Sequence, residues 1–362
     1  MASPVSTGPR RDDLEIAALE AQLHSPRLPK RVPLGVGAAA VVVGLVLLLA
    51  LGAGIALSFF VGWLVFAVVL VVLSRVVEGA RKSKDRLATT LVTTAFVVAL
   101  LPLASLLWQV FSNGAPTLSS TFLTSSMRNV VGEGGGIYHA IWGTVLVTGL
   151  ATVMSVPVGL LTAIYLVEYG GGKLSNAITF LVDVMTGIPS IVAGLFAYAL
   201  FAIFFGAGVR MGFGGAVALS VLMIPLVVRS GEEMLKLVPH DLREASYALG
   251  VPKWRTISKV VLPTALAGIV TGVTIATARV IGETAPLLII CGATDSTNFN
   301  LFSGRIMTLP VYIYGQYKNP GIPPQFSVDR AWGAALVLTI IVMTLSLFAR
   351  LVSHYFSPKT RA

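Results

Sequence analysis

The sequence predicts an all-α membrane protein with about eight transmembrane helices. Apolar residues make up 55% of the 362-residue chain and charged residues only 12%, whereas a soluble domain carries about 25% charged residues. Apolar stretches of about 20 residues, the length that a helix needs to cross a bilayer, recur along the chain without the short alternating runs of a transmembrane barrel. The expected spans are 34–53, 55–75, 88–110, 140–166, 176–205, 211–228, 260–292 and 331–349.

The placement of the basic residues predicts the orientation of these spans. With the N-terminus inside, 20 of the 26 lysines and arginines fall in cytoplasmic segments and five fall outside. Such a bias towards the cytoplasm places both termini there, in a multi-pass protein of the cell (plasma or inner) membrane. It also accounts for the net charge of +10, so no nucleic-acid partner is needed to explain it.

Cysteine and histidine usage predicts neither a disulfide nor a metal site. The one cysteine, Cys291, falls in an apolar span and is expected to be a packing residue. The four histidines lie in four separate segments without the spacing of metal ligands.

The chain begins with a polar tail and an uncharged hairpin. Residues 1–33 form a cytoplasmic tail, in which Asp12 to Leu23 could be a short helix on the membrane or on a partner; a partly ordered tail is the preferred interpretation. No charge occurs from Leu34 to Ser74, twice the length of one span, and glycines at 52 and 54 mark the turn. The predicted segments are a tail (1–33), an extra hairpin with a basic loop (34–87), a span with an outer loop (88–134), a main domain (135–350) and a C-terminal cytoplasmic tail (351–362).

A short capped helix is expected at 242–249, in the cytoplasmic loop between two spans. Asp241 is a good N-cap, and Glu244 three residues later completes a capping box. Gly250 suits the position just after the helix. One face carries three apolar residues: Leu242, Ala245 and Leu249. Two turns are too short to be stable alone, so this helix needs a surface to lie against.

This loop resembles the EAA loop of ABC-importer permeases, the binding-protein-dependent family. The family pattern is E-A-A, three residues, G, nine residues, I-x-L-P; here it reads Glu244-Ala245-Ser246, Gly250 and Val260-Val261-Leu262-Pro263, with Ser246 and Val260 as departures. The resemblance implies that the helix sits in a cleft of a separate ATPase subunit and passes the closing motion of that subunit to the spans. The implied coupling residues are Asp241, Glu244, Ala245, Leu249 and Gly250.

The chain carries no ATP-binding motif of its own. A P-loop reads G-x-x-x-x-G-K-[S/T], and the nearest approach, Gly172-Lys173-Leu174, has Val167 in place of the first glycine and Leu174 in place of the hydroxyl. We therefore expect a transporter subunit that makes no covalent bond and holds no cofactor, with ATP and magnesium bound by partner subunits.

Two charges lie inside the expected span 260–292. Arg279 and Glu283 stand four residues apart, on one face of a helix, and each costs at least ~2.5 kcal/mol at membrane depth. They are expected to face a passage, or else to form a structural ion pair between helices. Pro286 should bend the helix just past the pair, and Gly282 should let another backbone approach.

The run Gly282-Glu283-Thr284-Ala285-Pro286-Leu287 resembles the A-type permease subunits of phosphate importers, and so does Gly187 to Phe196, where Pro189 breaks a span. The resemblance covers about 135–350 and implies a type I importer permease core of six spans, counting 88–110. It also implies a translocation site at Arg279, Glu283 and Thr284, in which the arginine binds a tetrahedral oxyanion and the glutamate holds the arginine. The expected helix breaks near the pathway are Pro189, Gly282 and Pro286.

The predicted function is ATP-driven import of inorganic phosphate. The implied partners are a homologous C-type permease, two ATPase subunits and an extracytoplasmic phosphate-binding protein. Sulfate or molybdate as cargo, or the C-type subunit itself, are alternatives. An ion-coupled secondary transporter, with Glu283 relaying protons, is an alternative of another class, and a membrane enzyme is disfavoured because no nucleophile–base or metal cluster occurs in a span.

Overall fold

The computed structural model describes residues 28–29, 31–50 and 54–356. Within these residues every regular element is a helix, so the predicted all-α class is confirmed. Seven described helices are long and apolar enough to cross a membrane, or up to eight spans if the bent pair α7 (Lys173–Thr186) and α8 (Ser190–Phe205) counts as one. The predicted helix Asp12 to Leu23 and the end of the C-terminal tail lie outside the described residues.

The chain forms two compact units, one up to Leu106 and the other from Leu107 onwards. The first holds α2 (Val32–Ala50), α3 (Ile55–Val77) and the larger part of α4 (Ala80–Gly114).

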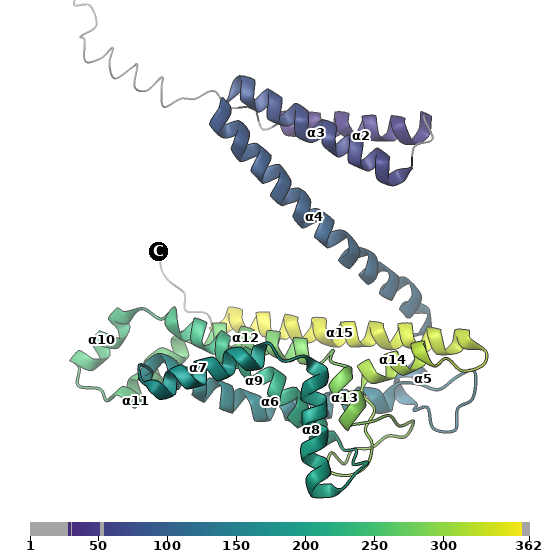
Figure 1. Ribbon diagram of the computed structural model, residues 1–362, viewed down its shortest axis with the longest axis vertical. Helices are drawn as coiled ribbons and strands as arrows, with labels where there is room; N and C mark the ends of the chain where they lie inside the picture. The colour runs from purple at the N-terminus through teal and green to yellow at the C-terminus, as the bar shows by residue number, and fades with distance from the viewer. Residues whose placement is uncertain (1–27, 30, 51–53, 357–362) are drawn as a thin grey trace, which may run out of the picture. The chain divides into compact units, whose positions relative to one another are not determined.

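Helices α2 and α3 pack against one another as the predicted hairpin (Figure 1). A Cβ atom added at Gly62 of α3 would lie 3.0 Å from the carbonyl oxygen of Ala40 in α2, and one added at Gly44 would lie 3.2 Å from the carbonyl oxygen of Ser58. The absence of side chains at these glycines therefore lets the two backbones come close, as in other membrane helix pairs.

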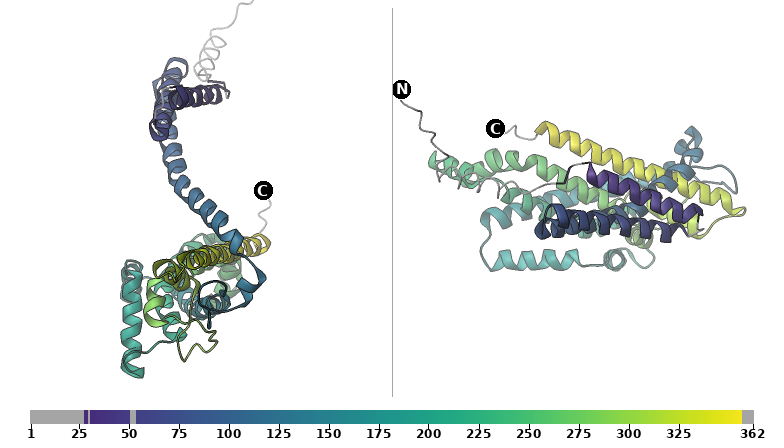
Figure 2. Two further views of the ribbon diagram at one scale, coloured as in Figure 1. Left: turned by 90° about the vertical axis from the view of Figure 1, so that its right-hand side faces the viewer. Right: turned by 90° about the horizontal axis from the view of Figure 1, so that it is seen from above.

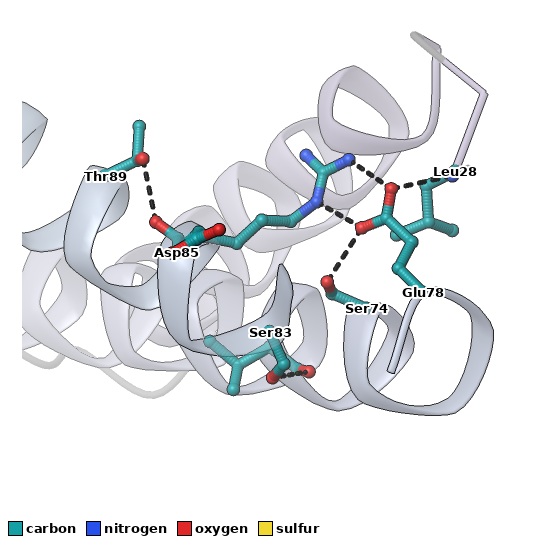
Figure 3. A network of polar contacts seen from close by, with 8 residues as sticks. Leu28, Ser74, Glu78, Ser83, Asp85 and Thr89 are labelled. Atoms are coloured by element: carbon teal, nitrogen blue, oxygen red, sulfur yellow. Dashed lines mark hydrogen bonds and ion pairs between the residues drawn. The ribbon is translucent and has the colours of Figure 1, made fainter. Parts of the chain in front are cut away.

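A buried carboxylate fastens the end of α3 to the start of α4 (Figure 3). The side chain of Glu78 is 3% exposed and pairs with Arg86, whose Nε and Nη2 lie 2.6 and 2.9 Å from its two oxygens. It also accepts hydrogen bonds from the Ser74 hydroxyl and from the backbone N–H of Leu28. The hydrogen bond from Arg86, which outweighs the opposing effect of burial, lowers the pKa of Glu78 to about 2.

The second unit is a bundle centred on α9, which packs against α6 and α12, while α12 also packs against α15 (Figure 2). Its helices of five or more residues are, in chain order, α5 (Ser120–Thr124), α6 (Tyr138–Ile164), the π-helical turn Tyr165–Tyr169, α7, α8, α9 (Gly212–Lys236), α10 (His240–Ala248), the π-helical turn Ile257–Val261, α12 (Leu262–Val280), α13 (Ala285–Ile290), α14 (Leu309–Lys318) and α15 (Pro324–Phe356). The single turn α11 (Lys253–Thr256) joins α10 to the second π-helical turn.

Two predicted spans are not continuous helices. The expected span 176–205 is broken at residues 187–189, where α7 and α8 meet at an angle of 107°. The expected span 260–292 consists of two helices: α12, which ends at Val280, and the short α13, which begins at Ala285. The segment 293–330 between the last two expected spans contains α14 and the start of α15. The spans were predicted from hydropathy, which measures how apolar a segment is. Hydropathy does not indicate where glycine or proline residues turn the backbone.

The Glu78 network makes the stability of the first unit depend on pH. Glu78→Gln should lower the thermal midpoint of the detergent-solubilised chain at pH 7, because Arg86 loses its charged partner. The folded-state pKa is depressed from 4.5 to about 2, so the carboxylate contributes fully above about pH 4.5 and its contribution disappears as the pH falls towards 2. The difference between wild type and variant should shrink over that interval. Asp85→Asn, at an exposed position of α4 next to Arg86, is the matched control; a difference independent of pH would contradict the assignment.

Candidate functional site

A cavity of about 240 Å³ lies where the two broken spans meet. Its wall is formed by the end of α7, the first residues of α8, the middle of α9 near Pro225, and the end of α12 with the residues after it. Two charged side chains, Arg279 and Glu283, line the cavity, and Pro189 and Ser190 lie on the opposite segment. The structure thus brings the break at Pro189 together with the two charges predicted at membrane depth.

Arg279 and Glu283 do not share a helix, contrary to the sequence prediction. Arg279 stands in the last turn of α12, whereas Glu283 lies in the break, where its backbone N–H donates to the carbonyl of Val280. Both side chains are described, and neither forms a hydrogen bond or an ion pair with another described residue. The anticipated structural ion pair is therefore not formed here, and the guanidinium donors are free to meet a solute in the cavity.

The other residues predicted near the pathway are placed differently. Pro286 does not bend a helix after the charges; the break precedes it, and Pro286 lies in the first turn of α13, buried against α8. Within the described chain no second backbone approaches Gly282, since an added Cβ would meet only the Arg279 carbonyl, at 4.0 Å. Thr284 is the N-cap residue of α13, half-buried and outside the cavity wall.

An ion-pair network lies one turn from the cavity. Asp183 of α7 pairs with Arg229 of α9, and Arg229 also binds Glu232 at 2.9 Å. Glu232 in turn pairs with Lys236 at 2.7 Å. Asp183 and Arg229 each stand about one turn from cavity-lining residues of their own helix. The network therefore joins the two helices that form opposite parts of the cavity wall.

The helix expected in the cytoplasmic loop is α10, with a different start and the predicted end. It begins at His240 with Pro239 as N-cap, so Asp241 is not the cap but lies in the first turn, where a negative charge favours the helix dipole. At its end Gly250 adopts φ +76°. The N–H of Gly250 donates to the Tyr247 carbonyl and that of Val251 to the Ser246 carbonyl. These two bonds are the Schellman motif, which fixes where the helix stops.

The inner face of α10 is anchored by a buried arginine that the sequence did not single out. Arg243 pairs with Glu168 of the π-helical turn after α6, at 3.0 and 3.1 Å, and both side chains are no more than 10% exposed. The same guanidinium donates to the carbonyls of Leu235, in the last turn of α9, and of Val238, just after that helix. The arginine therefore ties α10 to two spans at once. In a helix Arg243 falls on the face opposite Leu242, Ala245 and Leu249. This position is the one sequence signal that could have indicated its role.

Ser246, one of the two residues that depart from the importer motif, has a hydrogen-bond partner of its own. Ser246 stands where the family pattern has alanine, and its hydroxyl lies 2.8 Å from that of Thr256, with both residues buried. The substitution thus adds a hydrogen bond between α10 and the segment after it.

The outer face of α10 is open. The predicted coupling residues are all exposed: Asp241, Glu244, Ala245, Leu249 and Gly250. Leu242 is exposed beside them. Apolar side chains presented on a rigid helix with no cover from the described chain are typical of a surface that another protein contacts.

Known proteins are similar to this chain in sequence and in fold. Residues 155–362 match the family model described as binding-protein-dependent transport system inner membrane component. The chain is 48% identical over 284 residues to the phosphate transport system permease protein PstA 1 of Mycobacterium tuberculosis (strain ATCC 25618 / H37Rv), covering 78% of this chain and 91% of the relative. It is 37% identical over 284 residues to PstA of Pasteurella multocida (strain Pm70), covering 78% and 97%.

A solved structure shows the same fold at low sequence identity. It is the crystal structure of a bacterial alginate ABC transporter in complex with an alginate pentasaccharide-bound periplasmic protein. The likeness has a TM-score of 0.54 and 13% identity, and covers 76% of this chain and 96% of the chain in that structure.

The Arg243–Glu168 pair should be needed for stability. Glu168→Gln leaves a buried guanidinium without its counter-charge, and breaking such a pair costs about 3 kcal/mol. The thermal midpoint of the purified chain in detergent should fall accordingly. Glu233→Gln, at an exposed position near the end of α9, should leave it unchanged; equal midpoints for the two variants would show that the pair is dispensable.

Proposed function

Because the chain belongs to the family of binding-protein-dependent transport system inner membrane components, we propose that it is the A-type permease subunit of an ATP-driven importer of inorganic phosphate. The observation that carries this proposal is the cavity between the broken spans, which holds an arginine without a counter-ion from the described chain. The named phosphate permeases to which the chain is similar supply the cargo.

The cavity has the chemistry that an oxyanion requires. The planar guanidinium of Arg279 offers paired N–H donors that match two oxygens of a tetrahedral anion. The negative charge of Glu283 repels a dianion in the same cavity. This repulsion weakens binding of the anion and makes its release easier, as transport requires. Thr284 lies next to Glu283 and could add a hydroxyl donor once α13 moves. The chain makes no covalent bond in this cycle; it binds, orients and releases the anion.

The energy for transport comes from outside the chain. Helix α10, clamped on its inner face and open on its outer face, suits docking to an ATPase subunit, where ATP and magnesium would be bound. The proposed assembly holds this chain, a homologous C-type permease, two ATPase subunits and an extracytoplasmic phosphate-binding protein. In it, both termini and α10 lie on the cytoplasmic side, as the charge bias predicts.

Removing the cavity arginine should stop transport and leave the assembly intact. Arg279→Gln should reduce phosphate uptake by the reconstituted importer by at least about tenfold, because one charge-assisted hydrogen bond to the anion is lost. The fold should be unaffected, because the Arg279 side chain forms no hydrogen bond or ion pair among the described residues. Co-purification with the partner subunits should be unchanged. Arg128→Gln, which removes an exposed arginine elsewhere, is the matched control. Loss of assembly in Arg279→Gln would indicate a structural role instead.

Reversing a charge on the outer face of α10 should prevent binding of the ATPase subunit. Glu244→Lys should abolish co-purification of the ATPase subunit, because the first turns of α10 form the proposed contact. Glu133→Lys makes the same reversal at an exposed position before α6, outside α10, and should retain the ATPase. A wild-type chain that transports phosphate without any ATPase would refute the importer assignment altogether.

A further inference from the structure

Two arginines converge at the far end of α13 from the cavity. Gly292, just after α13, is buried with φ +73°. A Cβ added there would lie 3.2 Å from Cδ of Arg210 and 3.4 Å from Cδ of Arg305. The missing side chain at Gly292 therefore leaves the space in which the aliphatic arms of both arginines pass the backbone.

Backbone hydrogen bonds hold both arginines in this place. The N–H of Met211, next to Arg210, donates to the Ile290 carbonyl at 3.0 Å. The N–H of Ile306, next to Arg305, donates to the Cys291 carbonyl at 3.2 Å. The backbone hydrogen bonds thus join three segments of the chain, and these bonds fix the positions of the two arginines.

One of the two guanidinium groups is also oriented by an aromatic ring. The Cζ atom of Arg210 lies 4.9 Å from the ring centre of Tyr198 in α8, and the hydroxyl of Tyr198 accepts from the N–H of Gly208. The Arg210 guanidinium donates to the carbonyl of Val209 and also contacts the Tyr198 hydroxyl. Stacking on a ring occupies the face of a guanidinium and leaves its other in-plane donors available.

No carboxylate in the described chain neutralises this pair. Neither Arg210 nor Arg305 forms an ion pair among the described residues. Glu133 and Asp329 line another cavity, with Arg330, and Asp295 is exposed without an ion pair. Nor do the arginines serve as caps for α13, because the carbonyls of Ile290 and Cys291 already accept backbone N–H groups. Two adjacent positive charges repel one another, so a pair kept without a counter-ion is suited to an external anion.

The two arginines lie on the opposite side of the second unit from α10. Helix α9 begins two residues after Arg210 and ends at Lys236, close to α10, and α13 lies away from α10 and α11 (Figure 1). The six residues of α13 span about 9 Å, which separates the pair from the break that holds Glu283. An anion entering from outside would meet Arg210 and Arg305 before Arg279.

We propose that Arg210 and Arg305 form an outer oxyanion-binding site that receives inorganic phosphate and passes it along α13 to the cavity at Arg279. This inference rests on the proposed function. The two sites use the same chemistry at opposite ends of one short helix, and the outer one raises the local concentration of the anion at the mouth of the passage.

The test is phosphate uptake by the complete importer, with its ATPase subunits and binding protein, in proteoliposomes. The double variant Arg210→Gln/Arg305→Gln should lower uptake at low phosphate roughly tenfold, the lower end of electrostatic focusing, and should lose most of the dependence of uptake on salt. Arg305→Gln alone, at an exposed side chain, should give an intermediate loss, and Arg305→Lys should retain the salt dependence. Arg128→Gln is the control for one lost outer charge.

Three results would overturn the outer site. Unchanged uptake in the double variant, while wild type imports phosphate, would refute it and leave the proposed function standing. Loss of ATPase stimulation by the loaded binding protein would show that the arginines bind that partner. A defect that appears with phosphatidylglycerol in the membrane and vanishes in pure phosphatidylcholine would assign them to a lipid headgroup. Failure of the wild-type importer to take up phosphate would instead refute the proposed function.

Discussion

The contact between Gly194 of α8 and Pro286 of α13 holds the two broken spans together, and the cavity depends on it. A Cβ at Gly194 would lie 2.5 Å from Cα of Pro286, so any side chain there would push α13 away from α8. With the helices in contact, the ends of α7 and α12 face one another across the cavity. The break also favours the arginine directly, because Arg279 stands in the last turn of α12, where a positive charge is stabilised by the helix dipole.

The helical class, the hairpin and the positions of most spans followed from hydropathy, because each depends on local composition. The breaks followed only in part. Pro189 and Pro286 did mark the two broken spans, but Pro286 starts a helix where it was expected to bend one. Proline lacks an N–H that the first turn does not need, so it is well placed at such a start. The same reasoning explains α10: Pro239 takes the N-cap position, and the helix begins before Asp241.

Contacts between distant residues could not be predicted from one sequence. Glu168 and Arg243 are 75 residues apart, and nothing in either local pattern pairs them. The sequence did identify Arg279 and Glu283 as unusual, because charge in an apolar run is visible without a fold. It could not reveal that a backbone break separates them, nor that Arg210 and Arg305 share the space beside Gly292.

The buried Arg243 also determines how α10 is joined to the cavity. The chain itself leads from α10 through the segment before Pro263 into α12, which suggests that motion of α10 reaches Arg279 along that helix. The structure adds a second connection, because Arg243 binds the carbonyls of Leu235 and Val238 at and just after the end of α9. From there to Pro225 in the cavity wall is about ten residues of continuous helix, about 15 Å. In the proposed importer, a displacement of α10 would therefore act on two walls of the cavity together, through α9 and α12, and change its width.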